Sequence, residues 1–457
     1  MPTTARHPKR LSASAAAALL RPSDTLAVPL GPGQPTAFLA ALGERDDWTD
    51  LRVFAALLVS LPAVFTRRGV TLLSGFHGPV ERGLAAAGYD VRFVAADFRR
   101  FALLARRMAP RVMATLATPP DAAGRLSLSL HAGATVDELH RAARDPKRLL
   151  VVETSPHLPR TRGLPPDHPH CLTLDEIDVW IEGDAHPPAL PEGEIRPIER
   201  AIAGHVAQII PDGATLQTGI GGIPSAVAQL LASGSGGDYG IHSEMFTTGL
   251  MQLHEAGKVT NRKGLYDGFS ICTFALGTPE LYAWLDERDD VRFLPVELVN
   301  DPAAIARNRS MISINGALSV DLAGQIVADT LGRRQFSGIG GHEEFVAGAS
   351  FSPGGRSLIC LPSTAALSDR LVSRIVSALP AGSIVTTPRH QVDVVVTEYG
   401  AAELAGRTDD ERARALIAVA HPDLRERLSA EAVDLLAARR GVSPARLSSD
   451  PESHSSD

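Results

Sequence analysis

Two glycine-rich loops and one glutamate are the residues of this 457-residue chain whose types and spacing could do chemistry. The first loop is Gln217 to Pro224 (Gln-Thr-Gly-Ile-Gly-Gly-Ile-Pro), and the second is Ser337 to Phe345 (Ser-Gly-Ile-Gly-Gly-His-Glu-Glu-Phe). Glu244 ends an apolar strand pattern that begins at Gly240. A carboxylate can attack an electrophilic carbonyl, and backbone N–H groups of a glycine loop can stabilise the oxyanion that forms. We therefore interpret Glu244 as a nucleophile that faces a glycine loop.

Both features have simpler readings. The first loop lacks the dinucleotide fingerprint Gly-x-Gly-x-x-Gly, because Pro224 stands at the sixth position. It can bind an oxyanion or phosphate at the start of a helix, or it can be a tight turn without a ligand. A glutamate at a helix start often serves the helix dipole. Glu244, however, follows the carboxyl end of a strand, and that edge of an open α/β sheet is where ligands bind.

The second loop contains His342-Glu343-Glu344, which invites a metal interpretation. The zinc-protease pattern requires a second histidine four residues after the first, and Val346 stands there. We predict no metal site. The chain has neither the Gly-x-Ser-x-Gly elbow of serine hydrolases nor a Walker A sequence.

Composition excludes several classes of protein. The formal net charge is -7 without an extended basic run, which argues against a nucleic-acid partner. Cys171, Cys272 and Cys360 are far apart, so we expect neither a disulfide framework nor a zinc site, and a cytoplasmic location is the simplest. The apolar run Ser12 to Leu20 is short and predicts a first helix. No apolar stretch reaches the roughly 18 residues of a membrane span, so we predict no membrane partner.

Apolar runs alternate with helical patterns along most of the chain, which predicts an α/β fold with parallel sheets covered on both faces. Expected strands include 25–30, 70–73, 91–94, 111–117, 149–153, 214–217, 240–244, 268–274, 291–299, 357–361 and 392–397. Expected helices include 36–42, 197–210, 409–417 and 423–438.

The Pro-rich, acidic stretch between Asp184 and Arg196 is the best domain boundary. It separates a domain at 11–190 from one at 191–440. Residues 441–457 are Ser-rich and predict a disordered tail. Each half begins with a helix, a turn with Asp, a strand and a Gly-rich loop. This order indicates related halves, although turns between strand and helix favour glycine in any case.

Several longer segments together resemble the acetyl-CoA hydrolase/transferase family, a branch of the class I CoA-transferases. The likeness runs from about Leu11 to about Leu428 and is strongest from Gln217 onward. The segments that carry it are 217–224, Ile-His-Ser-Glu-Met-Phe at 241–246, Pro-Val-Glu-Leu-Val-Asn-Asp-Pro at 295–302, 313–322 with Gly324-Gln325, 337–341, 396–400 and 412–422. Weaker marks are Pro119-Pro120-Asp121 and 153–163 with Pro159-Arg160.

The resemblance implies two similar open α/β domains with the active site in the cleft between them. It implies that Glu244 becomes a glutamyl-CoA thioester. Backbone amides at Ile220, Gly340 and Gly341 would form the oxyanion hole. The residues implied to bind coenzyme A are Gly219, Ile220, Gly221, Gly222, Ile223, Gly341, His342 and Arg356. Coenzyme A and acyl-CoA would be substrates, with no permanently bound cofactor. The partners would be short carboxylic acids, and the protein would be a homo-oligomer.

The chain departs from the family pattern in the second loop. Where the family often has Gln, Asp-Phe and Arg-Gly-Ala, this sequence has His342, Glu344-Phe345 and Ala347-Gly348-Ala349, and Arg356 replaces a common lysine. These changes bear on the substrate more than on the chemistry. The loop Gly31 to Pro35 is a candidate wall of the substrate pocket, because it follows a strand at the same kind of sheet edge.

Three hypotheses follow from these residues. The leading one is a CoA-transferase that moves CoA between short carboxylic acids. The second is a short acyl-CoA hydrolase, in which water resolves the intermediate. The third is an acyl-CoA-binding protein without turnover.

Overall fold

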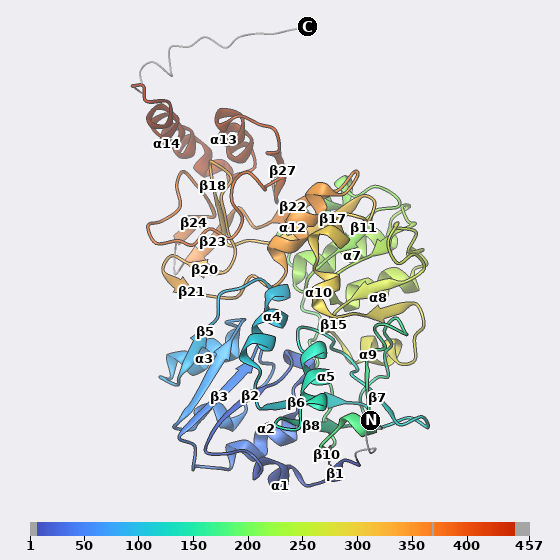
Figure 1. Cartoon of the computed structure of the whole chain (residues 1–457). Helices are drawn as coiled ribbons and strands as arrows, with labels where there is room; N and C mark the ends of the chain where they lie inside the picture. Colours follow the sequence, from blue (N-terminus) through green and yellow to red (C-terminus); the bar gives the residue numbers. More distant parts are fainter. Residues whose placement is uncertain (1–6, 368–369, 444–457) are drawn as a thin grey trace.

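The chain folds around two sheets, one in each half, which are wholly or mainly parallel and lie at the bottom and the upper right of Figure 1. A computed structural model describes residues 7–367 and 370–443. The predicted disordered tail lies outside the described residues from 444 onward. Both halves are therefore α/β units, as the apolar runs of the sequence predict.

The first sheet is wholly parallel and has the strand order β1-β10-β8-β6-β2-β3-β4-β5. Its strands are β1 (Lys9–Arg10), β2 (Ser23–Ala27), β3 (Asp50–Ala55), β4 (Val70–Ser74), β5 (Val91–Phe93), β6 (Val112–Ala117), β8 (Leu149–Thr154) and β10 (Val179–Glu182).

Helices cover both faces of this sheet, because consecutive apolar residues of a strand point to opposite sides. Leu26 and Val53 pack on one side with α1 (Ala13–Ala17), α2 (Thr36–Gly43) and α3 (Pro79–Ala86). Ala27 and Phe54 pack on the other side with α4 (Phe98–Met108) and α5 (Val136–Arg144). The continuous apolar runs of the sequence are thus explained by burial on both faces.

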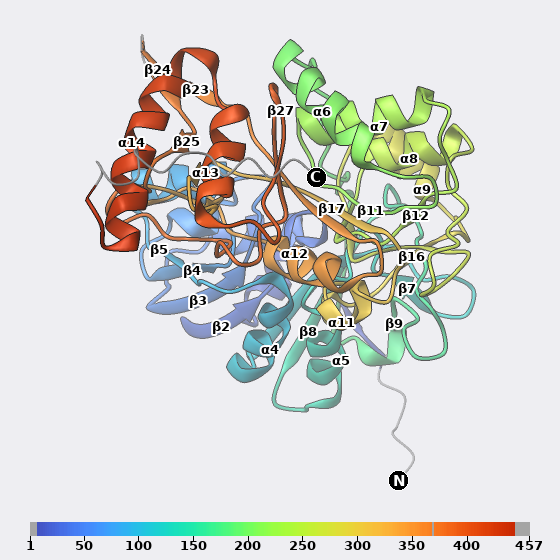
Figure 2. The ribbon, with the colours of Figure 1, turned by 90° about the horizontal axis from the view of Figure 1, so that it is seen from above.

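The second sheet has the order β12-β11-β17-β22-β26-β27 and is parallel except for its last strand. Its strands are β11 (Thr215–Gln217), β12 (Gly240–Ile241), β17 (Met311–Gly316), β22 (Arg356–Cys360), β26 (Val394–Thr397) and β27 (Gly400–Glu403). Figure 2 shows α6 (Pro197–Ile209) and α7 (Gly222–Ser233) on one side of β11 and β17, and α12 (His342–Phe351) on the other.

Short elements complete the second half. Two parallel pairs join β13 (Met245–Phe246) to β15 (Phe274–Ala275) and β14 (Ser270–Cys272) to β16 (Val291–Phe293). The remaining helices there are α8 (Thr248–Glu255), α9 (Pro279–Leu285), α10 (Val296–Val299), α11 (Pro302–Ile305), α13 (Asp409–Ala418) and α14 (Pro422–Arg440). None of the helices in the described part of the chain has the length and apolar character needed to span a bilayer.

A group of short strands between residues 319 and 376 has no counterpart in the sequence predictions. It contains β18 (Ser319–Asp321), β19 (Ile326–Val327), β20 (Thr330–Leu331), β21 (Arg334–Gln335), β23 (Thr364–Leu367), β24 (Arg370–Ser373) and β25 (Ile375–Val376). Short 3-10 helices in the described residues are Gly31–Gly33, Ala63–Thr66 and Leu174–Glu176. The antiparallel pair of β7 (Arg125–Ser127) and β9 (Cys171–Thr173) belongs to the first half.

The expected strand at 291–299 is wrong beyond Phe293, because Pro295 precedes α10 instead of continuing the strand. The stretch between β10 and α6 contains no helix or strand, in agreement with a linker. The domain limits 11–190 and 191–440 themselves stay predictions.

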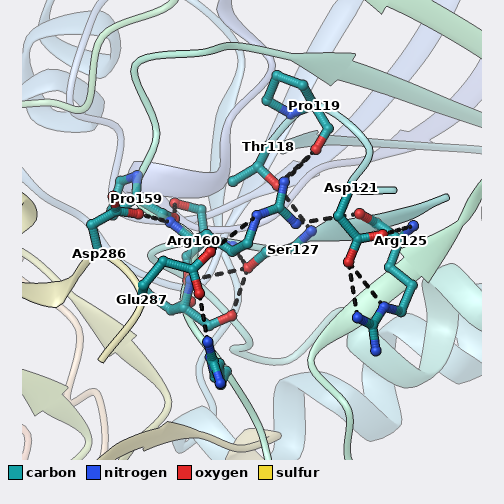
Figure 3. Close-up of polar contacts among 12 residues, drawn as sticks. Thr118, Pro119, Asp121, Arg125, Ser127, Pro159, Arg160, Asp286 and Glu287 are labelled. Atoms are coloured by element: carbon teal, nitrogen blue, oxygen red, sulfur yellow. Dashed lines mark hydrogen bonds and ion pairs between the residues drawn. The ribbon is translucent and has the colours of Figure 1, made fainter. Parts of the chain in front are cut away.

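The segment around Arg160 joins the two halves (Figure 3). The Arg160 N–H donates to Asp286 Oδ1 at 2.7 Å, and the Glu287 N–H donates to the Arg160 carbonyl at 2.9 Å. The guanidinium of Arg160 turns back to the first half and donates to the carbonyls of Pro119 and Arg125 at 2.6 and 3.3 Å. Two of the weaker family marks therefore meet at a joint that fixes one half against the other.

Candidate active site

Glu244 lies in a break between two strands, which corrects the predicted continuous strand from Gly240 to Glu244. β12 ends at Ile241 and belongs to the second sheet, whereas β13 begins at Met245 and pairs with β15. The Ser243 N–H donates to the Ile271 carbonyl at 3.0 Å, so the chain changes partner strand before it reaches the glutamate. The break turns Glu244 out of the sheet at its carboxyl edge.

The backbone of Glu244 is tied to both neighbouring segments. Its carbonyl accepts N–H groups from Thr273 at 2.9 Å and Phe274 at 3.3 Å. The Ser243 hydroxyl donates to the Thr218 carbonyl at 3.1 Å and so connects the glutamate to the first glycine loop. Because these hydrogen bonds connect the backbone at Glu244 to two neighbouring segments, the position from which its carboxyl group projects is well defined.

The Glu244 carboxyl group is partly buried and accepts two hydrogen bonds. Asn300 Nδ2 donates to Glu244 Oε2 at 2.7 Å, and the Gly341 N–H donates to the same carboxyl group. Burial raises the pKa of Glu244 to about 7, although both hydrogen bonds favour the charged form. A substantial fraction of the group is therefore a carboxylate near neutral pH.

A second carboxyl group, that of Glu344, lies behind Asn300. Asn300 Nδ2 donates to Glu344 Oε2 at 2.7 Å, so one side-chain amide contacts both acids. Glu344 is 3% exposed, and the Arg99 N–H of α4 donates to its Oε1 at 3.1 Å. Burial, together with the nearby negative charge of Glu244, raises the pKa of Glu344 to about 8 against the effect of the Asn300 hydrogen bond. The inner acid is mainly protonated at pH 7.

The second glycine loop is held against the first half. The Phe98 N–H, at the start of α4, donates to the Gly340 carbonyl at 3.0 Å, and the Arg82 guanidinium of α3 donates to the Phe336 carbonyl. A Cβ at Gly338 would lie 2.6 Å from the Gly75 carbonyl oxygen, so only glycine allows this approach. The two halves together place the loop beside Glu244.

The Glu244 carboxyl group opens into a cavity of about 220 Å³ between the halves. The first half contributes Leu30, Ala56, Leu57, Gly75, Phe76, Phe98 and Phe101. The second half contributes both glycine loops, Met245 and Phe274, and the polar side chains Gln217, Thr218, Asn315 and His342. Leu30 lines the cavity, but none of the residues Gly31 to Pro35, the predicted wall, is among its described lining residues. Ala56 and Leu57 come from a loop after β3 that the sequence analysis did not identify.

Most residues predicted for the site lie at this cavity. Gly219, Ile220, Gly340, Gly341 and His342 line it. Gly221 and Gly222 line an adjoining depression of about 370 Å³, which shares Gly219 and Ile220 with the cavity. Ile223 instead packs against the core of the second half.

The carboxylate of Glu199 lies next to the amino-terminal end of α7. A Cβ at Gly222 would collide with the Glu199 carboxylate, which also lines the adjoining depression. Glu199 is paired with Arg196 at 2.7 Å, and both side chains line the depression, so charges of both signs lie near this helix start. The phosphate-binding interpretation of the first loop stays a prediction.

His342 lines the cavity, is largely buried and has a hydrogen bond at one ring nitrogen. Its Nε2 lies 2.9 Å from Thr387 Oγ1, and that hydroxyl donates to Glu343. Burial lowers the pKa of His342 to about 4, so the ring is neutral at pH 7. The adjacent acids diverge, since Glu343 contacts Thr387 whereas Glu344 contacts Asn300.

Arg356 lies away from this group, so the geometry does not support its predicted contact with coenzyme A, which stays a prediction. It begins β22, at the amino end of the strand, whereas the glycine loops and Glu244 follow the carboxyl ends of β11 and β12. Its guanidinium forms ion pairs with Asp393, at 2.8 Å, and with Glu403. The position therefore stabilises the opposite edge of the sheet.

Asn300 is a polar residue of the site that the sequence analysis did not single out. It stands 56 residues from Glu244 in the chain, after the short helix α10, and contacts Glu244 only through the fold. Asn300 lies in the segment Pro295 to Pro302, which resembles the family, and this resemblance is the only indication of its role in the sequence analysis.

Comparisons with known proteins show which family the chain belongs to. The family described as acetyl-CoA hydrolase/transferase C-terminal domain matches residues 277–432. A succinyl-CoA:cyclohexane-1-carboxylate CoA transferase of Geobacter metallireducens is 36% identical over 91% of this chain and 92% of its own length. An acetyl-CoA hydrolase of Eremothecium gossypii is 29% identical over 49% of this chain and 43% of its own. The crystal structure of RipA from Yersinia pestis superimposes with a TM-score of 0.85 at 32% identity, covering 94% of this chain and 98% of RipA.

Proposed function

Because the chain belongs to the acetyl-CoA hydrolase/transferase family, we propose that it moves coenzyme A from an acyl-CoA to a free carboxylate through a thioester on Glu244. The observation that carries the proposal is the Glu244 carboxyl group, which lies in the cavity between the halves and accepts hydrogen bonds from Asn300 and Gly341. Coenzyme A and acyl-CoA are substrates in this scheme.

The first step is attack of the Glu244 carboxylate on the thioester carbonyl. A bond forms between a Glu244 oxygen and the acyl carbon, the C–S bond breaks, and CoA leaves as a thiolate. The product is a mixed anhydride between the acid and Glu244. The oxyanion of the tetrahedral intermediate would be stabilised by backbone N–H groups near Ile220, Gly340 and Gly341, which lie at the cavity.

In the second step the thiolate attacks the Glu244 carbonyl. The C–O bond of the anhydride breaks, the first acid leaves as a carboxylate, and Glu244 carries the CoA thioester. An acceptor carboxylate then reverses the two steps and departs as the new CoA ester. The thioester energy is conserved, because no step requires water.

Asn300 and Glu344 would orient the nucleophile in every cycle. Each N–H of the Asn300 amide can serve one acid, at 2.7 Å in both cases. A protonated Glu344 leaves Glu244 as the principal negative charge of the pair, which avoids repulsion between two buried carboxylates. Glu344 does not line the cavity and acts through Asn300.

An acceptor assay separates transfer from hydrolysis. Purified protein is incubated with butyryl-CoA, with and without acetate, and CoA esters are identified by mass spectrometry. We expect acetyl-CoA to appear only with acetate, and a mass increase on the peptide that contains Glu244. Butyryl-CoA loss that is indifferent to acetate, without a new ester, would establish a hydrolase. No adduct and no turnover would establish an acyl-CoA-binding protein.

Two further expectations belong to this proposal. A cytoplasmic location is consistent with three free cysteines in the described residues. A homo-oligomer rests on the family resemblance alone and stays a prediction.

A further inference from the structure

The first-half wall of the cavity has the composition of a protein core. Leu30, Ala56, Leu57, Phe98 and Phe101 line it, and Met245 and Phe274 continue the same surface from the second half. Among the described residues of the lining there is no lysine or arginine, and the only titratable side chains are Glu244 and the neutral His342. A charged group on the acyl chain would thus be buried without a partner of opposite sign.

The size of the cavity sets a second limit. Its volume is about 220 Å³. An apolar protein cavity of about 150 Å³ is large enough to hold benzene. The space beside Glu244 therefore accommodates a ring-sized apolar body together with the carboxyl group that attaches it.

The wall is held rigidly on both sides of Leu57. Leu57 has a φ of 49°, in the left-handed region that a leucine rarely adopts. The backbone of Gly31, with a φ of 27°, lies so close that a Cβ there would be 3.4 Å from the Leu57 carbonyl oxygen. Phe98 packs edge-on against Phe274, with ring centroids 6.1 Å apart. Backbone conformation as well as side-chain packing therefore defines the surface of this wall.

Resting on the proposed function, we infer that the enzyme selects monocarboxylic acids with an uncharged, apolar body of about four to seven carbons. Each methylene that reaches the wall favours binding by about fourfold. A second carboxylate is disfavoured on the order of a hundredfold, because nothing on the wall neutralises it. The preference is set by the first half, whereas the chemistry is set by the second.

The test compares four acceptors with one donor. Acetate, butyrate, cyclohexanecarboxylate and succinate are offered with propionyl-CoA, and each new CoA ester is measured by mass spectrometry. Butyrate and cyclohexanecarboxylate should have kcat/KM values at least tenfold above acetate, with succinate lowest. Succinate equal to or better than butyrate would overturn the inference while leaving CoA transfer intact.

Two variants test the wall itself. Ala56→Leu narrows the cavity and should lower kcat/KM for cyclohexanecarboxylate at least tenfold, with acetate changed less than about threefold. Leu57→Gly widens the cavity, suits the left-handed backbone and should reduce the butyrate-to-acetate ratio about fourfold. The matched control is Leu61→Gly, on the same loop with its leucine 59% exposed, which should leave the ratio unchanged. Equal ratios in all variants would overturn the inference.

Binding without turnover is measured in parallel as the rise in Tm that each free acid produces. If no acid yields a new CoA ester, the proposed transfer fails. The apolar pocket is then supported if cyclohexanecarboxylate raises Tm more than succinate in the wild type but not in Ala56→Leu. It is overturned if succinate raises Tm as much.

Discussion

The two walls of the active-site cavity differ in kind. The wall from the second half presents polar side chains, glycine-loop backbone and the Glu244 carboxyl group beside apolar residues such as Met245 and Phe274, whereas the wall from the first half presents only apolar side chains and Gly75. The polar wall is defined by hydrogen bonds such as those from Asn300 to Glu244 and Glu344. The apolar wall is defined by packing and by the backbone of Leu57.

The difference separates reactivity from selectivity. Loss of a hydrogen-bond donor on the polar wall removes stabilisation of charge, which affects every acid equally. A change of shape on the apolar wall affects acids according to their size. Substitutions on the two walls should thus be distinguishable by whether they alter rate uniformly or alter the ratio between acids.

The largest effect is expected at the nucleophile. Glu244→Ala should lower CoA exchange on the order of 10⁴-fold or more for every acid and abolish the mass increase on the Glu244 peptide. Glu255→Ala, an exposed acid at the end of α8, serves as the control and should retain wild-type exchange. Exchange that survives Glu244→Ala would refute the covalent role and with it the contrast between the walls.

Asn300→Ala should produce the next largest effect. Loss of a preorganised donor to the nucleophile should lower kcat by about 10²–10³ with little change in KM. The reduction should be the same for acetate and butyrate, because Asn300 does not line the apolar wall. Unequal reductions for the two acids, measured from steady-state kinetics, would show that the walls are not independent.

Glu344→Gln should change stability in a pH-dependent way. The folded pKa of Glu344 is about 8, above its ordinary value of 4.5, so between these pH values unfolding releases a proton and wild-type stability falls as pH rises. Glutamine carries no such proton, so the Tm of the variant relative to wild type should rise from pH 5 to pH 8.5 by about 2 °C or more. A Tm difference that is constant with pH would contradict a protonated inner acid.

The smallest effect is expected at Arg356. Arg356→Gln removes ion pairs with Asp393 and Glu403 at the amino edge of the second sheet. The loss should cost up to about 1 kcal/mol of stability, and KM for acyl-CoA should stay within about twofold of wild type. A KM for acyl-CoA that rises more than tenfold, at unchanged kcat, would support the prediction that Arg356 binds coenzyme A.

The sequence predicts the polar wall better than the apolar one. Glu244 and the glycine loops could be found because strand ends and glycine clusters are local patterns. The sequence also indicates that Arg356 lies far from the ligand-binding edge. Arg356 precedes an expected parallel strand and is thus at its amino end, whereas ligands bind at the carboxyl ends of such strands. Asn300 could not, because its role depends on a contact 56 residues distant.

Most of the apolar wall cannot be predicted from the sequence, because its residue types are the same as those of a hydrophobic core. Ala56 and Leu57 follow β3, a strand whose pattern of Leu51, Val53 and Phe54 was not recognised. Leucine and alanine after a strand carry no signal that distinguishes a substrate pocket from packing. Only the approach of the two halves, with Arg160 and Asp286 at their joint, turns these residues toward Glu244.

The space around Gly341 limits which residues can replace it. A Cβ at this position would come within 3.0 Å of both Glu244 Oε2 and Asn300 Nδ2. Even alanine, the smallest possible step, would have to displace the nucleophile or its amide donor. A substitution at position 341 would therefore move groups that take part in the reaction, whereas a substitution at Ala56 changes the space on the opposite wall of the cavity.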